Sequence, residues 1–487
     1  MDVGTGSVKA TVLDGEGNVV LNSSVALPDI MTRGVEAEAN SNDWWVAFNR
    51  LLKELRGSIR LEEVSSLCVG GQGPTLVPVD REGKALHNAL IWMDRRASVE
   101  ANRIGEATGD KVDSYLFESK ALWIKNHAPR VYERTYKFLS AYDFISYKLT
   151  GRPSTGVLRA GRIPWWTIPY WAPEHLGAVG VDLGKMAEPV LVGESLGEIT
   201  LSASEETGLR EGTSVVQGVT DFAHDILGGG VSEPGLALDH GGTSQGFDLC
   251  WQRDLPDHAN RTLSSPHIIP EYWNISGLMS TTGALLRWFR DNFCEIEVEE
   301  ARRLGVDPYD LMGKLAARIG PGSDGLLVLP YFAGERSPIW DVHARGVFFG
   351  LSLAHTKAYL IRALMESVAY AIRHVNEVIT ELGGSVREIR AVGGQSRSDL
   401  WNQIKSDVLG LPVVAVDCES TASLGAAITA AFGTRTFTSL REGSERVVKV
   451  RKRFEPNAAN HEKYNHYFAV YKKLYPSLKD CFRELEA

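Results

Sequence analysis

One short pattern occurs twice in the chain, and this repeat constrains the fold more than any other feature. An acidic residue, a glycine and a threonine stand together at Asp2–Thr5 and again at Asp239–Thr243. Each copy leads into an alternating stretch that predicts a β-hairpin. A single Gly-Thr hairpin is usually a plain turn. Two copies, each at the start of an α/β half, instead predict two domains that hold a polyphosphate with backbone N–H groups and hydroxyls.

The length, net charge and cysteine content of the chain limit the class of protein to which it can belong. A length of 487 residues favours two large domains or three smaller ones over a single core. The formal net charge of −9 disfavours nucleic acid as a partner, because phosphate-backbone binding needs clustered Lys and Arg. No apolar run of about 18 residues occurs, which argues against a membrane span. The five cysteines are scattered and form no C-x-x-C pair. We therefore expect a cytoplasmic protein without a disulfide framework or a zinc site.

Local patterns predict the elements along the chain. Alternation predicts hairpins over 7–27 and 75–86, and a buried strand over 64–71. Helical spacing follows an Asn/Asp start and predicts a helix over 41–57. The remaining expectations are a helical segment over 110–150, a Pro- and Trp-rich loop with short helix over 151–190, and a highly charged helical C-terminal segment.

Nine sequence blocks, in this order, resemble the FGGY family of carbohydrate kinases. They are D-x-G-T-x-S-x-K-A (2–10), G-Q-x-x-T-L-V-x-x-D (71–80), A-L-I-W-x-D-x-R (89–96), G-V-T-D (218–221), G-G-T-S (241–244), L-P-Y-F-A-G-E-R-S-P (329–338), A-R-G-V-F-F-G-L (344–351), G-G-Q-S-R-S-D-L-W (393–401) and L-G-A-A-I-T-A (424–430). The resemblance extends from residue 2 to about residue 435. It is specific for the family and leaves the substrate open.

The resemblance implies an α/β fold with two ribonuclease H-like (actin/hexokinase-type) ATPase domains and an interdomain active-site cleft. We expect a sugar-binding, catalytic domain over 1–230, a nucleotide-binding domain over 231–435 and a charged helical appendage over 436–487. The implied reaction transfers the γ-phosphoryl group of ATP to a hydroxyl of a small carbohydrate, with Mg2+. The implied partners are ATP and a sugar, without nucleic acid or membrane, and a homodimer is a candidate assembly.

Asp221 is the expected catalytic base. It follows an apolar strand and precedes a helix, and it matches the family's catalytic acid. The alternative is that its carboxylate only caps the helix over 222–228. Asp225 lies one turn later and could share a face with Asp221, although a solvated or structural role is the better interpretation for it.

The resemblance also assigns ATP and metal contacts. Asp2 matches the family acid that holds Mg2+, which takes one or two carboxylates together with phosphate oxygens. Further ATP contacts implied by the family fall on both halves of the chain: Thr5, Ser7, Lys9, Thr243, Gly283, Arg287, Gly394 and Ser398. The Gly393-Gly394 pair opens a helix, where backbone N–H groups can meet an anion.

The sugar pocket departs from the family pattern. Gly73-Pro74 replaces the Arg-Glu of glycerol kinases and the Met-His of xylulokinases, and Phe222 replaces a hydroxyl-binding amide. A site that loses hydroxyl contacts changes its substrate, so glycerol becomes unfavourable. The remaining candidates for substrate contact are Gln72, Trp92, Asp94 and Tyr115, with Trp166 as an apolar wall. A pentulose such as xylulose is the expected substrate, and ribulose, a heptulose or a tetritol are alternatives.

Two other functions fit the same fold. One is an actin/Hsp70-like ATPase whose nucleotide drives a conformational change. The other is a kinase homologue that only senses sugar. The blocks around Trp92 and Asp221 argue against the first, and retention of Asp2, Thr5, Asp221 and Thr243 argues against the second.

The start of the chain differs from the family pattern as well. Only Met1 precedes the first block, whereas the family places several apolar strand residues there. We expect either that the native start lies upstream of Met1 or that the first strand is shortened.

Overall fold

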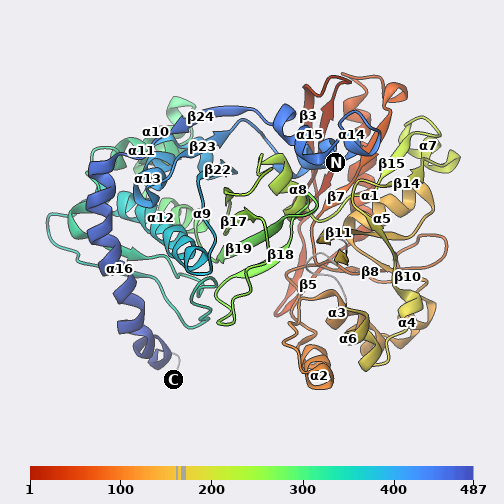
Figure 1. Cartoon of the computed structure of the whole chain (residues 1–487), viewed down its shortest axis with the longest axis horizontal. Helices are drawn as coiled ribbons and strands as arrows, with labels where there is room; N and C mark the ends of the chain where they lie inside the picture. The colour runs from red at the N-terminus through yellow and green to blue at the C-terminus, as the bar shows by residue number, and fades with distance from the viewer. Residues whose placement is uncertain (161–162, 166–171, 486–487) are drawn as a thin grey trace. The chain divides into compact units, whose positions relative to one another are not determined.

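The computed structural model describes residues 1–160, 163–165 and 172–485, and the chain forms two compact units (Figure 1). The first unit consists of Met1–Gly228, Pro266–Tyr272 and Glu419–Val447. The second unit consists of Gly229–Ser265, Trp273–Cys418 and Val448–Ala487. Residues 419–447 thus return to the first unit, whereas the sequence analysis had divided the chain at 230 and 435.

The first unit is built on two neighbouring sheets, with strand orders β3-β2-β1-β7 and β14-β15-β6. Strand β1 pairs antiparallel with β2 and parallel with β7. The hairpin predicted over 7–27 is confirmed as β2 and β3. The bounds are β1 (Asp2–Val3), β2 (Ser7–Leu13), β3 (Val19–Ala26), β6 (Ser66–Cys68), β7 (Gly70–Gly71), β14 (Ser195–Glu198) and β15 (Ser214–Val216).

Helices cover these sheets. The predicted helix over 41–57 is confirmed as α1, whose N-cap Asn40 accepts a hydrogen bond from the Asn42 amide. Its apolar face buries Trp44, Phe48 and Leu51 in the core of the first unit. The helices of this unit are α1 (Ser41–Leu55), α2 (Ser98–Thr108), α3 (Phe117–His127), α4 (Pro129–Arg134), α5 (Ala141–Thr150), α6 (Pro173–Ala178), α7 (Leu201–Thr207), α8 (Asp221–Gly228), α14 (Thr421–Gly433) and α15 (Leu440–Val447), with 3-10 turns η1 (Leu61–Glu63) and η2 (Leu183–Lys185).

Two of three small sheets in the first unit correct local predictions. The helical pattern over 110–150 is interrupted by β10, which pairs with β8, because the apolar side chains of Phe138 and Leu139 are buried there. Residues 75–86 fold back as the predicted hairpin: Val79 forms an antiparallel bridge with Ala85, the Asp80 amide donates to the Lys84 carbonyl, and the Leu86 amide donates to the Pro78 carbonyl. The segment predicted as loop contributes β11 and β13. The bounds are β4 (Met31–Arg33), β5 (Glu36–Ala39), β8 (Val77–Val79), β9 (Ala89–Leu90), β10 (Lys137–Leu139), β11 (Ser154–Ala160), β12 (Ile163–Trp165) and β13 (Glu188–Leu191).

The second unit contains a seven-stranded sheet with the order β18-β19-β17-β16-β22-β23-β24. The hairpin predicted after Asp239 is confirmed as β16 and β17. The strands are β16 (Leu236–Gly241), β17 (Gln245–Trp251), β18 (Leu263–Pro266), β19 (Trp273–Met279), β20 (Leu327–Leu329), β21 (Val347–Phe349), β22 (Glu388–Val392), β23 (Val413–Val416) and β24 (Val450–Phe454). The helices are α9 (Gly283–Phe293), α10 (Glu295–Leu304), α11 (Pro308–Ala316), α12 (Lys357–Glu381), α13 (Asp399–Leu409) and α16 (Ala458–Glu484), with 3-10 turns η3 (Ser323–Gly325) and η4 (Gly394–Arg397).

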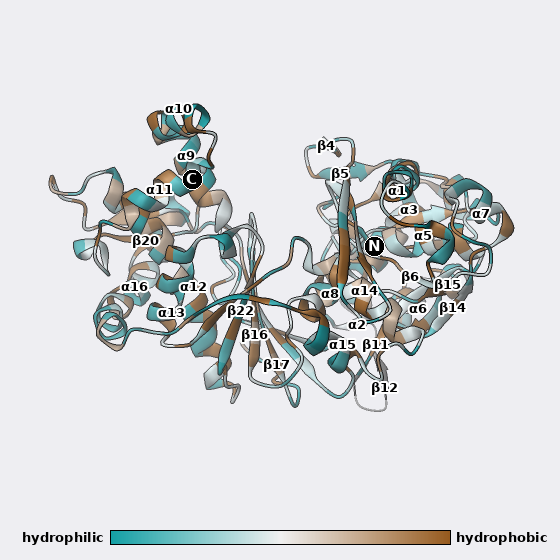
Figure 2. Cartoon of the chain, turned by 90° about the horizontal axis from the view of Figure 1, so that it is seen from above, coloured by the Kyte–Doolittle hydropathy of each residue, from teal (hydrophilic) through white to brown (hydrophobic). Residues whose placement is uncertain are grey.

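From Val448 onward the C-terminal segment belongs to the second unit, whereas its first residues, with α15, belong to the first. Strand β24 pairs with β23 at the edge of the sheet, and α16 packs against α12 and α13 (Figure 1). Tyr464, Phe468 and Tyr471 of α16 are buried in the core, which is why this segment is not a purely helical appendage. Figure 2 shows hydrophobic residues along β16 and β22 and a hydrophilic surface on α15.

Candidate active site

Three predicted site segments of the first unit leave the same edge of a sheet. Strands β1 and β7 are parallel, and Gly71 forms a parallel bridge with Thr220. The chain continues from these positions into the Gly4-Thr5 turn, into Gln72 and into Asp221. Carboxyl ends of parallel strands lie at one edge, where α/β proteins place their ligands. The fold therefore brings the predicted phosphate, sugar and catalytic residues of this unit together.

Hydrogen bonds connect the phosphate turn with the sugar loops. The indole N–H of Trp92 donates to Oγ1 of Thr5 at 2.9 Å, and this hydroxyl lies 3.4 Å from Oε1 of Gln72. The Gln72 amide in turn donates to the Gly4 carbonyl at 3.3 Å. Trp92 stays 41% exposed, so one side of its ring is available to a ligand.

Asp221 is the first residue of α8 and is half-buried. Its Oδ1 accepts a hydrogen bond from the Phe222 amide at 2.7 Å, the amide of the next residue, whereas a capping side chain accepts from an amide two or three residues further on. The position also favours the ionised carboxylate, because the N-terminus of a helix carries partial positive charge. An ionised carboxylate at a strand end can accept a proton, so this contact is compatible with the role as base that the sequence predicts.

Asp2 has the environment of a cation ligand. It is 5% exposed, and its Oδ1 has no hydrogen-bond partner among the described residues. Burial, followed by the nearby charge of Asp225, raises the pKa of Asp2 to about 7, and Lys9 opposes this shift. Lys9 lies directly opposite Asp2 on β2. A buried carboxylate oxygen without a donor is suited to a divalent cation, so the residues present fit Mg2+.

Asp225 is not solvated, which corrects that part of its interpretation. It is 7% exposed and accepts a hydrogen bond from the Thr421 hydroxyl of α14. The structural part of the interpretation is confirmed. The negative charge of Asp225 also acts on Asp2, where it contributes to the raised pKa of that carboxyl.

Asp94 was predicted to contact the substrate, and its surroundings in the structure do not support this prediction. The residue is 0% exposed, and its carboxylate accepts hydrogen bonds from the Ala37 amide and from the Arg96 guanidinium. The Arg96 guanidinium also lies 2.9 Å from Glu38. A carboxylate that is saturated inside the fold cannot meet a sugar hydroxyl, so Asp94 instead fixes the loop that carries Trp92.

Lys120 is a positioning residue that the sequence analysis missed. Its side chain on α3 is 0% exposed, and its ammonium donates to the carbonyls of Pro74 and Ile91 at 2.8 and 2.7 Å. These carbonyls belong to the two loops that carry Gln72 and Trp92. Burial lowers the pKa of Lys120 well below its ordinary value. No local sequence signal could have found it, because a lysine on an amphipathic helix is usually exposed.

Tyr115 precedes α3 and is half-buried. The Arg95 guanidinium lies 4.4 Å above its ring, a cation–π contact that joins it to the Trp92 loop. Arg95 itself is 46% exposed and lies 3.7 Å from Asp113. The predicted wall residue Trp166 lies outside the residues that the structure describes.

In the second unit, the second Gly-Thr hairpin contacts the start of α9. The Gly283 amide donates to the Gly242 carbonyl, and the Ala284 amide to the Thr243 carbonyl, at 3.0 and 3.1 Å. The Arg287 guanidinium donates to Oγ1 of Thr243 at 3.0 Å. A Cβ on Gly283 would come within 2.2 Å of the Gly242 carbonyl, so this contact requires glycine. Thr243, Gly283 and Arg287 thus form one cluster, as expected of residues that share a ligand.

The acid of the second hairpin is neutralised, unlike that of the first. Asp239 accepts a hydrogen bond from the Lys405 ammonium at 2.6 Å, and both side chains are 1% exposed. The same ammonium donates to Oε1 of Gln395 at 3.0 Å. Two similar sequence patterns therefore have different chemistry: Asp239 is a structural ion pair, whereas Asp2 retains an oxygen without a partner.

Gly394 and Ser398 belong to the loop around η4. Gly394 is exposed, and a Cβ added to it would meet no atom within 4 Å, so its backbone has space beside it. Gln395 connects this loop to α9 by donating to the Thr282 hydroxyl at 3.1 Å. Ser398 N-caps α13 by accepting the Trp401 amide, which gives its hydroxyl a structural partner.

Two Gly-Thr hairpins, a buried carboxylate without a partner and a second carboxylate at a parallel strand end define a phosphotransferase. The comparisons agree with this class. The chain belongs to the FGGY family of carbohydrate kinases: the model of the N-terminal domain matches residues 1–228, and that of the C-terminal domain matches residues 241–434. It is therefore a sugar phosphotransferase, and the resemblance inferred from its motifs is confirmed.

Curated relatives differ in their named substrates. A xylulose kinase of Staphylococcus epidermidis is 29% identical and covers 100% of this chain and 97% of its own. A gluconokinase of Bacillus subtilis is 29% identical over 92% of this chain and 89% of its own. An autoinducer-2 kinase of Klebsiella pneumoniae is 30% identical over 98% of this chain and 93% of its own. These names do not fix the substrate of this chain.

Solved structures confirm the two-domain sugar kinase fold. A xylulose kinase from Rhodospirillum rubrum superposes with a TM-score of 0.84 at 27% identity, covering 99% of each chain. A gluconate kinase from Lactobacillus acidophilus gives a TM-score of 0.87 at 22% identity over 100% of this chain and 98% of its own. Within the described part of the chain, every helix is too short or too polar to cross a membrane.

Proposed function

We propose that this sugar kinase transfers the γ-phosphoryl group of ATP to a hydroxyl of a pentulose such as xylulose, with Asp221 as the general base. The observation that carries this proposal is the common sheet edge in the first unit. There Asp221 follows Thr220, Gln72 follows Gly71, and Gly71 pairs with both Val3 and Thr220. A base, a polar sugar contact and a phosphate turn are the parts that phosphoryl transfer requires.

The proton of the attacking hydroxyl passes to a carboxylate oxygen of Asp221 as the oxygen attacks the γ-phosphorus and ADP leaves. Lys9 supplies positive charge beside the phosphate turn, while Thr5 and Ser7 supply hydroxyl donors. In the second unit, Thr243, Arg287 and the backbone at Gly394 are the proposed nucleotide contacts. Ser398 remains in this set through its backbone, since its hydroxyl caps α13.

Asp2 would hold Mg2+, with Asp225 adding to the negative potential behind it. When bound, this cation neutralises charge on the phosphate oxygens. Among the described residues, no cluster of three or more His, Cys, Asp or Glu side chains could hold a metal by itself. This agrees with a cation held partly by phosphate, because Mg2+ in nucleotide sites takes one or two carboxylates. We also propose a cytoplasmic location, which suits cysteines that are scattered along the sequence and form no C-x-x-C pair.

The pocket residues favour a ketose over glycerol. Gln72 offers an amide to a sugar hydroxyl, and the half-exposed ring of Trp92 offers an apolar surface to a sugar face. Phe222 adds a second apolar side chain beside Asp221. This combination provides few polar contacts, as suits a small linear sugar with a carbonyl group.

An aldonate is the second candidate. The observation that favours it is Arg95, a half-exposed guanidinium that lies over the ring of Tyr115 and next to the Trp92 loop. A guanidinium can bind a carboxylate in bidentate geometry. A gluconate-like substrate would engage this side chain, whereas a neutral pentulose would not need it.

The test is an ADP-release assay with purified enzyme, Mg·ATP and a panel of pentuloses, hexuloses, heptuloses, tetritols, glycerol and gluconate. The product is identified by mass as a sugar phosphate. We expect the highest kcat/KM with a pentulose. The highest kcat/KM with gluconate, together with its loss in Arg95→Ala, would establish the second candidate. ATP hydrolysis that is independent of sugar and yields no phosphorylated product would contradict both and support an actin-like ATPase.

A further inference from the structure

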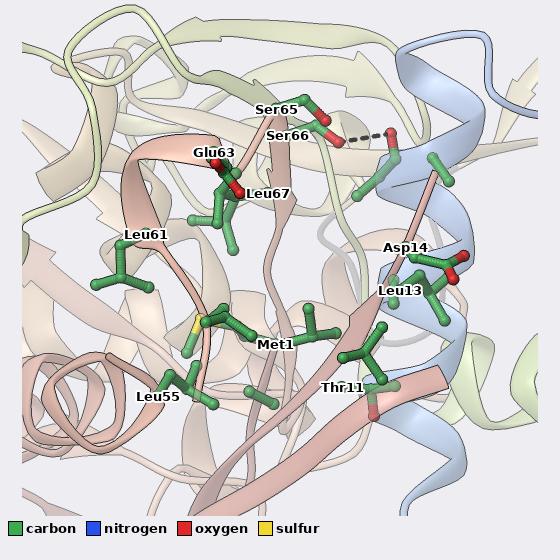
Figure 3. A pocket seen from close by; sticks show the side chains of 18 of the residues that line it. Met1, Thr11, Leu13, Asp14, Leu55, Leu61, Glu63, Ser65, Ser66 and Leu67 are labelled. Carbon is green, nitrogen blue, oxygen red and sulfur yellow. Dashed lines mark hydrogen bonds between the residues drawn. The ribbon is translucent and has the colours of Figure 1, made fainter. Parts of the chain in front are cut away.

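A cavity of about 710 Å³ lies beside β2 and β6 of the first unit, and Figure 3 shows Thr11, Leu55 and Ser66 around it. A different feature of the same unit is the side chain of His175 on α6, which has a carboxylate on each nitrogen of its ring. His175 and its two partners do not line the cavity, and none of the three is a residue of the candidate site. The arrangement around His175 is therefore a separate feature of the fold.

The ring of His175 lies between Asp110 and Glu118. Its Nδ1 lies 2.9 Å from Oε1 of Glu118, and its Nε2 lies 3.0 Å from Oδ2 of Asp110. The side chains of His175 and Glu118 are largely buried, whereas that of Asp110 is 64% exposed. Oε2 of Glu118 has no hydrogen-bond partner among the described residues, so His175 supplies a hydrogen bond to a carboxylate that burial has removed from water.

Two ionised carboxylates on one imidazole require a doubly protonated ring. A carboxylate accepts hydrogen bonds and donates none, while a neutral imidazole has one N–H and one lone pair. In the neutral form, one ring nitrogen would direct its lone pair at a carboxylate oxygen. With a proton on both nitrogens, the ring donates to Glu118 and to Asp110 at the same time. The geometry around His175 therefore favours the imidazolium.

The charged groups around His175 favour the same form. Burial lowers the pKa of His175, but the hydrogen bonds to Glu118 and Asp110 outweigh this effect and raise the pKa above its ordinary value of 6.5. Burial also raises the pKa of Glu118, and the hydrogen bond from His175 opposes that shift. Other charged groups on α6 and on the elements packed against it are exposed or have other partners: Glu100, Arg103 and Glu106 of α2, Lys120, Lys125 and His127 of α3, Glu174 of α6, and Asp182 and Lys185 around η2.

The two carboxylates stand at opposite ends of the connection between α2 and α3. Residues 109–116, all of which the structure describes, form this connection outside any helix or strand. Asp110 lies at its start, and Glu118 lies in the first turn of α3, directly after its end. His175 thereby holds both ends of the connection with one side chain.

The connection carries Tyr115, which the sequence analysis predicts as a substrate contact. The Tyr115 amide donates to the side chain of Asp113 at 3.2 Å, and the same carboxylate lies 3.7 Å from the Arg95 guanidinium. That guanidinium lies 4.4 Å from the centre of the Tyr115 ring. Because Arg95 belongs to the loop that carries Trp92, a displacement of the connection would move Tyr115 relative to the other proposed sugar contacts.

Helix α6 gives His175 a fixed position. The helix packs against α2 and α3, and the three helices lie together in Figure 1. Leu176, the residue after His175, is fully buried and belongs to one apolar cluster with Ile104 of α2 and with Phe117 and Leu122 of α3. The ring is therefore presented to the connection from a packed helix, and its protonation decides how firmly the connection is attached.

We propose that His175, with both ring nitrogens protonated, is a positioning residue for the sugar site: it links Asp110 to Glu118 and so fixes the connection that carries Tyr115. Release of one ring proton to solvent breaks one of the two hydrogen bonds. The bond to Asp110 is the one that breaks, because this exposed carboxylate can be hydrated instead, whereas Glu118 is buried. The inference rests on the proposed function, since it assumes that Tyr115 contacts the sugar.

The kinetic test is the pH dependence of the KM for the sugar at saturating Mg·ATP. The link is complete below pH 6.5 and is lost as pH rises through the raised pKa of His175. We expect the KM for the sugar to rise about 3- to 10-fold over this transition, as for the loss of one charge-assisted hydrogen bond, while kcat and the Kd for ATP stay within about 2-fold. A purely structural role would not change KM selectively.

Two substitutions of His175 separate its charge from its shape. His175→Arg carries a permanent cation with several N–H donors, so we expect a low KM without a pH transition. His175→Gln is neutral at every pH, so we expect the raised KM throughout. The matched control is His127→Gln, because His127 also bonds to a carboxylate, Glu100 of α2, but lies at the other end of α3. We expect this control to keep the pH profile of the unmodified enzyme.

Hydrogen exchange in the absence of sugar tests the link independently of catalysis. After correction for the intrinsic pH dependence of exchange, we expect protection of the amides of residues 109–116 to fall about 3-fold or more as pH rises through the transition. His175→Arg should keep this protection at every pH, and His175→Gln should lack it. Equal protection in the unmodified protein and in His175→Gln at low pH would overturn the proposal, and so would a KM transition that His175→Arg retains.

The failure of this inference and that of the proposed function are distinguishable. If protection of residues 109–116 follows His175 as expected but the KM for the sugar does not, the link exists and Tyr115 does not contact the sugar, which overturns the positioning role. If no sugar is phosphorylated, the proposed function fails, while the exchange data still decide whether His175 holds the connection.

Discussion

The indole N–H of Trp92 donates a hydrogen bond to Oγ1 of Thr5 across 2.9 Å. A residue proposed to contact the sugar is thereby bonded to a residue proposed to contact phosphate, inside one unit. The bond gives the loop that carries Trp92 a fixed position relative to the phosphate turn. Loss of this bond should therefore affect catalysis more than folding.

Trp92→Phe keeps an aromatic surface for the sugar and removes the N–H donor. We expect kcat/KM to fall about 3- to 10-fold, the cost of one neutral hydrogen bond. Steady-state kinetics at varied sugar and saturating ATP measure this change. Trp288→Phe is the matched control, since Trp288 is 38% exposed on α9 of the second unit. Equal kcat/KM for Trp92→Phe and the unmodified enzyme would show that the bond has no catalytic role.

Lys120→Met removes the ammonium that holds the carbonyls of Pro74 and Ile91. We expect the KM for sugar to rise about 10-fold or more, because both sugar loops lose an anchor, while the Kd for ATP stays within about 2-fold. The control is Lys125→Met on the same helix, whose ammonium donates to the carbonyl of Gly180 instead. A parallel loss of ATP and sugar affinity would indicate general misfolding and contradict the positioning role.

Lys405→Met leaves Asp239 buried without its cation. We expect the free energy of unfolding to fall by about 3–5 kcal/mol, as for other buried pairs that lose one partner. Urea denaturation measures this difference. The double variant Asp239→Leu with Lys405→Met should recover much of the loss, because it removes the unpaired charge. A double variant no more stable than Lys405→Met would contradict this explanation.

The buried carboxyl group of Asp143 makes the stability of the fold depend on pH, and Asp143 lies outside the candidate active site. It is 0% exposed, and burial raises its pKa from 3.8 to about 7. Between these two values the folded state binds more protons than the unfolded state, so the stability contributed by Asp143 falls as pH rises from about 4 to 7. Above pH 7 its contribution is constant.

Asp143→Asn removes this titration and keeps the hydrogen-bonding shape. We expect the free energy of unfolding of the variant to exceed that of the unmodified protein by a margin that grows between about pH 4 and pH 7. Chemical denaturation at a series of pH values measures both curves. Curves that remain parallel would show that Asp143 titrates normally in the folded state.

The sequence predicted the parts of the site that depend on local pattern. Both Gly-Thr hairpins were expected because an acid, a glycine and a threonine in an alternating stretch determine a turn between strands. The motif blocks also led to the family, which the domain models confirm. Thr5, Gln72 and Asp221 lie near one another because the strands that precede them pair in parallel. A local sequence pattern does not reveal which strands pair.

Residues that look alike in the sequence have different partners in the folded protein. Asp2 and Asp239 occupy the same motif position, yet Asp239 forms a buried ion pair with Lys405, which lies far away in the chain, whereas Oδ1 of Asp2 has no hydrogen-bond partner among the described residues. Asp94 appeared to be a free carboxylate beside Trp92 but is saturated by Ala37 and Arg96. Such pairings depend on tertiary contacts and could not be predicted from a single sequence.

The central claim is that Asp221 accepts the proton of a sugar hydroxyl during phosphoryl transfer. The most direct measurement is the single-turnover rate of sugar phosphate formation by Asp221→Asn with a pentulose and Mg·ATP, with Asp43→Asn in the first turn of α1 as the control. We predict a fall of about 10³-fold or more with the Kd for ATP within about 2-fold, and a normal rate for the control. A rate within about 10-fold of the unmodified enzyme would contradict the assignment of Asp221 as the base.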